Sequence, residues 1–106
     1  MSMKVIVLFP VRSFVEKVDD RTLGCIQRAL ILLEEYGHTL SMPFSKPIGG
    51  GLFELRIEGA ATIRMLYGFC DGAAIVVFAG KKERPALRPK DILLARRRLA
   101  LYCSCE

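Results

Sequence analysis

Alternating apolar and polar side chains predict β-strands in the second half of the chain. Every second residue is apolar in residues 52–57 and again in residues 63–69, which is the period of a strand with one face in the core. An Asp-Gly pair at 71–72 separates the second segment from the apolar residues 73–80, and this pair strongly favours a tight hairpin. The pattern therefore predicts a three-stranded antiparallel meander.

The first half of the chain has a less regular pattern. Residues 3–9 form a β-rich apolar run that is closed by Pro10, so they predict a buried first strand. Residues 11–18 fit one or two helical turns. Residues 38–51 contain two prolines and three consecutive glycines, which are typical of a loop.

Two longer helices follow from apolar residues at the helical period. The first begins near Arg21, where Asp19 or Asp20 would cap it, and ends at Gly37. Pro89 suits the first turn of a last helix, whose apolar stripe comprises Ile92, Ala95, Leu99 and Tyr102. Together the elements predict a single α+β domain over residues 1–106, with helices covering one face of a small antiparallel sheet.

The two hairpins predict which charged side chains share a face of the sheet. A three-residue first turn places Arg56 directly across from Arg64, and the second hairpin, continued without interruption, places Lys81 on the same face. Like charges opposed across strands cost up to about 1 kcal/mol, so the three cations predict a bound anion. The alternative is that Glu54 and Glu58, on the same face, neutralise the arginines.

Positive charge is concentrated in the last quarter of the chain. The net charge is +5, and residues 81–98 hold eight basic side chains against two acidic ones. Such a field favours nucleic acid or an acidic protein as the partner. The alternative explanation is a solvated basic helix face.

Composition excludes several other classes of protein. The chain is 52% hydrophobic and 25% charged, which fits a folded domain rather than a disordered one. Its apolar runs fall far short of the roughly 20 residues that a membrane span needs, and the first run is too brief for a signal peptide. We therefore expect a cytoplasmic protein with reduced cysteines. Because Cys103 and Cys105 have no second ligand pair, no structural metal or cofactor is expected.

Four segments in the second half carry a resemblance to a known family. Residues 46–56 read Lys-Pro-Ile-Gly-Gly-Gly-Leu-Phe-Glu-Leu-Arg, and Arg-Met-Leu-Tyr follows at 64–67. Phe-Ala-Gly-Lys-Lys stands at 78–82, and Pro-Lys-Asp-Ile-Leu-Leu-Ala at 89–95. This ordered set resembles the phage-derived RelE-like toxins, close to the HigB branch, and the resemblance covers about residues 30–102.

The resemblance implies both a fold and an activity. The fold would be that of RelE and ParE, a small antiparallel sheet packed against N-terminal helices, with a C-terminal helix. The activity would be that of the toxin in a type II toxin–antitoxin system, a metal-independent endoribonuclease that cleaves mRNA on the ribosome and inhibits translation. Its partners would be the ribosome, mRNA and a cognate antitoxin of the helix-turn-helix type, with no membrane involved.

The resemblance also implies roles for basic side chains. Arg56 and Arg64 would hold the scissile phosphate, because a guanidinium fork matches a phosphate group. Lys81 would transfer a proton or stabilise charge, and Lys82, at the opposite parity, is a further catalytic candidate that would contact flanking backbone. The expected RNA-binding residues are Lys46, Arg84, Arg88, Arg96 and Arg97. Tyr67 also matches a family position, but the register turns it toward the core.

Two other functions are consistent with the same fold. One is a ParE-like poison of DNA gyrase, which acts by protein binding without nuclease chemistry. The other is a catalytically silent module of phage origin that binds RNA or the ribosome. The Arg56/Arg64 pair and the double lysine at 81–82 favour the nuclease, because a gyrase poison needs no phosphate clamp.

Overall fold

The computed structural model describes residues 2–104, which form a five-stranded sheet and three α-helices. In chain order the elements are β1 (Lys4–Val7), α1 (Phe9–Val15), α2 (Asp20–Tyr36), the short 3₁₀-helix η1 (Gly37–Thr39), β2 (Ser45–Gly49), β3 (Leu52–Ile57), β4 (Ile63–Cys70), β5 (Ala73–Lys81) and α3 (Pro89–Ser104). The strands are ordered β1-β5-β4-β3-β2 in the sheet. The pairs β2–β3, β3–β4 and β4–β5 are antiparallel, whereas β1 is parallel to β5. The predicted α+β class is confirmed, with a mixed sheet.

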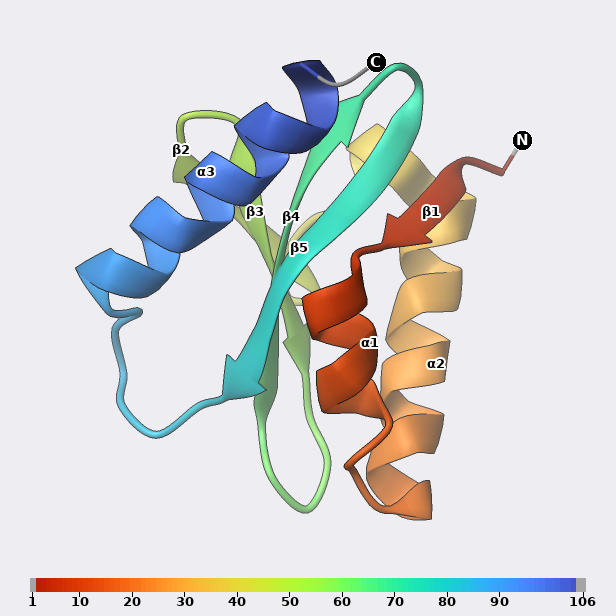
Figure 1. The fold of residues 1–106 in the computed structure, drawn as a ribbon. Coiled ribbons are helices and arrows are strands. Elements are labelled where there is room, and N and C mark those ends of the chain that lie inside the picture. Colours follow the sequence, from red (N-terminus) through yellow and green to blue (C-terminus); the bar gives the residue numbers. More distant parts are fainter. Residues whose placement is uncertain (1, 105–106) are drawn as a thin grey trace.

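Helices cover both faces of this sheet. Helices α1 and α2 pack on one face, and α3 crosses the other (Figure 1). The core under α1 and α2 contains Leu55, Met65 and Tyr67, and the core under α3 contains Leu66 and Ala95. The prediction that only one face is covered is therefore wrong, because the predicted stripe on the last helix packs against the second face.

The boundaries of α2 follow the two signals seen in the sequence. The Asp19 carboxylate accepts a hydrogen bond of 2.7 Å from the backbone N–H of Thr22, and Gly37 ends the helix with a φ of 52°. The hydrogen bonds from Thr22 lower the pKa of Asp19 below its ordinary value, and the charges of Arg21 and Lys81 lower it further by smaller amounts. The predicted cap and helix end are both confirmed.

Strand β2 lies where the sequence predicts only a loop. Its Lys46 pairs with Glu54 and its Pro47 with Phe53 of β3. Proline is tolerated here because β2 is an edge strand of the sheet, so the missing N–H costs no ladder hydrogen bond. At the opposite edge, β1 is half-buried rather than fully buried.

The hairpin registers are confirmed near each turn, but one of them shifts farther along. Arg56 pairs with Arg64, and Cys70 pairs with Ala73, as predicted. A β-bulge then makes Leu66 pair with Phe78 and Tyr67 with Val76, which leaves Val77 as an extra residue in β5. The carbonyl oxygen of Val77 accepts a 2.9 Å hydrogen bond from the guanidinium of Arg98 on α3. Beyond the bulge, the faces of β5 are reversed relative to the prediction.

Helix α3 is held close to the sheet near its C-terminal end. A Cβ at Gly68 of β4 would collide with the side chain of Leu99, so the absence of a side chain permits this approach. Cys70 and Cys103, with Cα atoms 6.0 Å apart, form a disulfide between the end of β4 and α3. The sequence predicts reduced thiols, whereas the structure pairs these two cysteines in a disulfide. Among the described residues, no helix has the length and apolar character needed to cross a bilayer.

Candidate nucleic-acid interface

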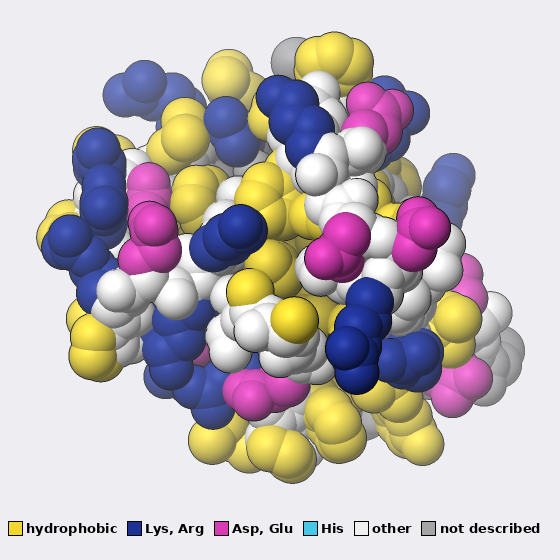
Figure 2. Space-filling model, turned by 90° about the horizontal axis from the view of Figure 1, so that it is seen from below, with side chains coloured by type: hydrophobic (Ala, Val, Ile, Leu, Met, Phe, Trp, Pro, Cys, Tyr) yellow, Lys and Arg dark blue, Asp and Glu magenta, His cyan; other side chains and the backbone are white. Residues whose placement is uncertain are grey.

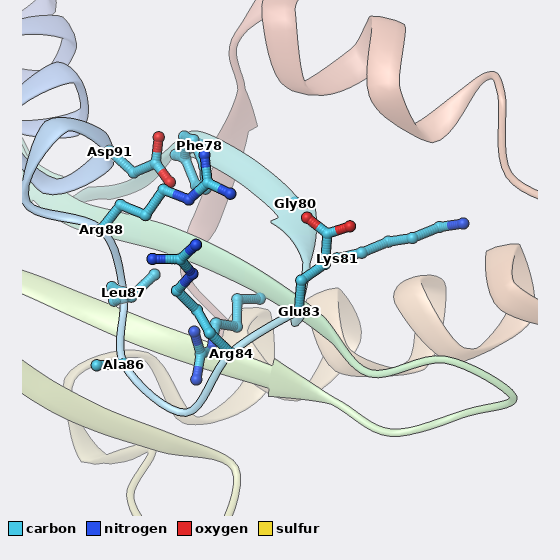
Figure 3. Close-up of a pocket in the computed structure, with 10 residues that line it drawn as sticks. Phe78, Gly80, Lys81, Glu83, Arg84, Ala86, Leu87, Arg88 and Asp91 are labelled. Carbon is cyan, nitrogen blue, oxygen red and sulfur yellow. The ribbon is translucent and has the colours of Figure 1, made fainter.

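A pocket with a volume of about 190 Å³ lies between the end of β5, the following loop (residues 82–88) and the start of α3. Its charged lining consists of Arg64, Lys81, Glu83, Arg84, Arg88 and Asp91. We call this the basic pocket. Figure 3 shows that Arg88 and Asp91 lie together at the helix start, while Arg84 extends from the loop. Seen from below, the side of the molecule that carries this loop and α3 gathers Lys and Arg side chains (Figure 2).

Arg64 forms the inner wall of the basic pocket and is already paired. Its residue is 7% exposed, and its Nε lies 2.9 Å from Oε2 of Glu54, which is 5% exposed. Its Nη2 also donates a hydrogen bond to the backbone carbonyl of Pro85 in the loop. Arg64 therefore joins the sheet to the loop, and the structure realises the alternative in which a glutamate neutralises this arginine.

Arg56 lies beside Arg64 but is far more accessible. Its side chain is 41% exposed, and its Nε is 3.8 Å from the exposed carboxylate of Glu58. Lys46 is accessible as well, with a side chain that is 54% exposed and 3.8 Å from the second oxygen of Glu54. Both contacts are long, and both cations are exposed, so both are available to a ligand.

The sequence predicts that Lys81 shares the face of the two arginines, but in the structure it lies on the opposite face. The bulge makes Lys81 pair with Ile63, whose side chain is in the core under α1 and α2. The Lys81 side chain extends away from the arginines of the pocket (Figure 3) and lines a hollow with Lys17 and Asp19. The prediction of its face is wrong, because it continued the register without interruption.

Lys82 takes the place in the register that was predicted for Lys81. Its backbone N–H donates a 2.8 Å hydrogen bond to the carbonyl of Thr62, which continues the ladder one residue past β5. Because side chains alternate along a strand, this position returns to the face of Gly80 and Arg64. Lys82 is half-buried, whereas Lys81 is exposed.

The other predicted RNA-binding arginines divide into two groups. Arg84 and Arg88 line the basic pocket. Arg96 packs against the β2–β3 turn, where a Cβ on Gly50 would collide with its guanidinium. Arg97 is exposed on α3, away from the residues that line the pocket. The structure therefore gathers Arg64, Arg84 and Arg88, but not Arg96 or Arg97.

Two carboxylates in the pocket, Glu83 and Asp91, are absent from the predicted site. The available signal was that they are the acidic residues within the basic segment 81–98. Carboxylates can accept a proton, and guanidinium groups can bind a phosphate and stabilise added negative charge. The basic pocket therefore has the components for chemistry on a phosphodiester.

Other polar residues are structural. Tyr67 is buried, and its hydroxyl is hydrogen-bonded to the hydroxyl of Ser45. Burial raises the pKa of Tyr67 above its ordinary value, and the predicted core position of this side chain is confirmed.

The described residues contain no cluster of three or more side chains suited to a metal ion. Cys105 lies outside the described residues.

Comparisons with known proteins agree with the fold. The model of a family described as "Phage derived protein Gp49-like" matches residues 13–100. Among solved structures, the chain is similar to the E. coli toxin RelE in the free state, in a variant with two arginines replaced by alanine. The two share 13% sequence identity with a TM-score of 0.70, over 93% of this chain and 99% of that chain. A search of curated proteins finds no significant match.

Proposed function

The chain belongs to the phage-derived Gp49-like family and has the fold of RelE, and on that premise we propose that it is the toxin of a toxin–antitoxin pair. We propose that it cleaves mRNA on the ribosome as a metal-independent endoribonuclease. The observation that carries this proposal is the basic pocket, where Arg84 and Arg88 line one hollow together with Glu83 and Asp91. Paired guanidinium groups are suited to a phosphodiester.

The proposed reaction is an attack of a ribose 2′-hydroxyl on the adjacent phosphate. A bond forms between the 2′-oxygen and phosphorus, and the bond from phosphorus to the 5′-oxygen of the next nucleotide breaks. The products are a 2′,3′-cyclic phosphate and a 5′-hydroxyl. One proton leaves the 2′-hydroxyl and another reaches the 5′-oxygen, so the site needs an acceptor and a donor.

The residues of the basic pocket suit these tasks. Arg84 and Arg88 would stabilise the extra negative charge on the phosphate oxygens in the transition state. Glu83 or Asp91 would accept the proton from the 2′-hydroxyl. Lys82 is not one of the residues that line the pocket, but its position in the register places it on the Arg64 face, and it would supply the proton for the leaving oxygen. Arg64, held by Glu54, would act as a positioning residue for the loop rather than as the phosphate clamp.

The proposal is tested with the purified protein, ribosomes programmed with a defined message, and primer extension to locate cuts. We expect cuts within the message that appear only when ribosomes are present and persist in a metal chelator. An intact message, in a translation reaction that the protein nevertheless inhibits, would favour the silent ribosome-binding alternative. Inhibition of gyrase with normal translation would favour the ParE-like alternative.

The bulge in β5 makes a prediction about the double lysine. We expect Lys82→Ala to reduce the cleavage rate by about 100-fold, the lower end of the range for general acid–base catalysis, because Lys82 has the parity of the Arg64 face. Lys81→Ala serves as the matched control. Lys81 borders the basic pocket, but its side chain extends away from the pocket's arginines (Figure 3), so the rate should be close to that of the parent. Cleavage rates on programmed ribosomes measure both. The opposite order of the two rates would contradict this placement.

The role of Lys82 is tested further by Lys82→Arg. If Lys82 donates a proton, Lys82→Arg should be nearly as slow as Lys82→Ala, because a guanidinium does not release its proton near neutral pH. If Lys82 only stabilises charge, Lys82→Arg should retain most of the activity.

We also propose an acidic antitoxin as the binding partner of α3. Leu93 and Leu101 are 61% and 59% exposed on this helix, and the exposed Arg97 lies between them in the sequence. An amphipathic segment with acidic residues would match this surface. Because opposite charges accelerate encounter, we expect the association rate constant to fall about tenfold or more between low and high salt. Stopped-flow measurement with a synthetic amphipathic peptide rich in glutamate checks this, and a salt-independent rate would contradict it.

A further inference from the structure

A second hollow, separate from the basic pocket, lies where β3 extends past β2. Strand β2 begins at Ser45, which pairs with Leu55, so Ile57 lies beyond the paired part of β2. The space beside it, about 520 Å³, is bounded by α2, by the loop before β2 and by the end of β3. We call this hollow the α2 groove. Its apolar floor comprises Ala29, Leu32 and Ile57.

Phe44 forms an aromatic wall of the α2 groove and is fixed by its backbone. Its N–H donates a 3.0 Å hydrogen bond to the carbonyl of Ser41, and its carbonyl accepts a 2.9 Å hydrogen bond from the N–H of Arg56. The residue is nevertheless 46% exposed. A half-exposed phenyl ring on a fixed backbone, beside open space, is suited to stacking, because little backbone freedom is lost when a flat ligand binds.

Three cations line the two hollows that Phe44 borders. Arg28 of α2 and Arg56 of β3 line the α2 groove with Phe44. Arg56 and Phe44 also line an adjoining shallow hollow with Lys46 of β2. Among residues 2–104, Glu58 is the one carboxylate that lines the groove. Its 3.8 Å ion pair with Arg56 is exposed and therefore weak. The lining of the groove therefore carries net positive charge together with the aromatic ring.

We propose that the α2 groove binds one nucleotide of a single-stranded RNA, with its base stacked on Phe44. The phosphate groups on either side of this nucleotide contact Arg28 and Arg56. A positive groove with an aromatic side chain is the arrangement by which proteins bind single-stranded nucleic acid. The choice of RNA as the ligand rests on the function proposed above. The groove and the basic pocket belong to the same sheet but share no lining residue.

An acidic peptide is the other ligand that a basic, partly apolar surface accepts, and the groove favours it less. Helical peptides bind through anchors at i, i+3, i+4 and i+7, which need an elongated apolar trough. Among the described residues, the α2 groove is lined by one aromatic side chain, Phe44, and by the cations Arg28 and Arg56 next to its apolar floor. Its volume lies within the range of small-ligand sites, so it fits one base and its sugar.

The experiment measures binding of a fluorescein-labelled, uridine-rich RNA of ten nucleotides by anisotropy. We expect Phe44→Leu to weaken binding about fivefold or more, the effect of losing one stacked base, because leucine fills the space without a π-face. Arg28→Gln should weaken binding and reduce its dependence on salt. Phe9→Leu, at a ring that is 71% exposed and outside the groove, is the matched control and should bind like the parent.

Photocrosslinking locates the ligand independently of affinity. RNA carrying 4-thiouridine should crosslink to the peptide that contains Phe44, and competition with unlabelled RNA should remove the signal. The inference is overturned if Phe44→Leu and Arg28→Gln bind RNA like the parent. It is also overturned if polyglutamate removes the crosslink at Phe44 more effectively than unlabelled RNA does.

The outcomes separate this inference from the proposed nuclease function. Message cleavage that depends on Arg84 and Arg88, with no crosslink at Phe44, would retain the nuclease and reject the groove. A crosslink at Phe44 with an uncut message on programmed ribosomes would retain the groove and reject the nuclease.

Discussion

Replacing Arg64 with alanine is expected to destabilise the domain by about 3–5 kcal/mol, the cost of leaving one partner of a buried ion pair without the other. The charge of Glu54, in a residue that is 5% exposed, would lose its 2.9 Å partner and keep only the long contact with Lys46, at 3.8 Å. The loop would also lose the hydrogen bond at the Pro85 carbonyl. For a domain of this size, the midpoint of thermal unfolding should fall by roughly 15–30 °C, measured by circular dichroism or calorimetry.

Two variants control this prediction. Arg56→Ala removes the neighbouring arginine on the same face, but its exposed ion pair is worth at most about 1 kcal/mol, so the midpoint should change little. The double variant Glu54→Leu with Arg64→Met removes both charges and should recover most of the lost stability. If Arg64→Ala unfolds at the same temperature as the parent, the ion pair has no structural role. From sequence alone the opposite result is expected, because Arg64 then reads as an exposed phosphate ligand.

Replacing Arg88 with alanine is expected to reduce message cleavage by about 100- to 1,000-fold, the usual effect of removing one group that stabilises transition-state charge. Arg84→Ala should have an effect of similar size. Arg84 is exposed and Arg88 half-buried, and both line the basic pocket. The folded state should therefore tolerate both changes. Single-turnover rates on programmed ribosomes, with unfolding curves for each variant, measure the two effects separately.

Arg97→Ala is the matched control, since it removes the same charge from an exposed position on α3. Its cleavage rate should remain within a few-fold of the parent rate, reflecting only the weaker general field. An equal loss for Arg97→Ala and Arg88→Ala would mean that overall charge, rather than the basic pocket, governs activity. Arg88→Lys should recover part of the loss, because a lysine keeps the charge but not the guanidinium fork.

Much of the fold could be predicted from local chemistry. The register of β3 against β4 follows from the alternation of apolar residues, so the pairing of Arg56 with Arg64 is predictable. The helix boundaries at Asp19 and Gly37 follow from capping. Strand β2 could not be predicted, because the proline within it is a strand breaker except at an edge, and the edge is a property of the whole sheet.

The candidate site was less predictable, for two physical reasons. Val77, the extra residue of the bulge, is as apolar as its neighbours and is fully buried, so the pattern carries no signal of the shift that moves Lys81 to the other face. The burial of Arg64 depends on the loop that covers it, and the path of that loop cannot be read from strand alternation.

Cys70 and Cys103 are 33 residues apart in the sequence, and their disulfide closes the chain between them into a covalent ring. The ring contains β5, the loop and most of α3, and with them every residue that lines the basic pocket except Arg64. In the oxidised protein, the disulfide prevents the C-terminal end of α3 from separating from the β4–β5 hairpin. In the reduced protein, the same helix is retained by side-chain packing and by the hydrogen bond from Arg98 to Val77. Samples prepared with and without a thiol reductant are therefore molecules of different topology around the same pocket.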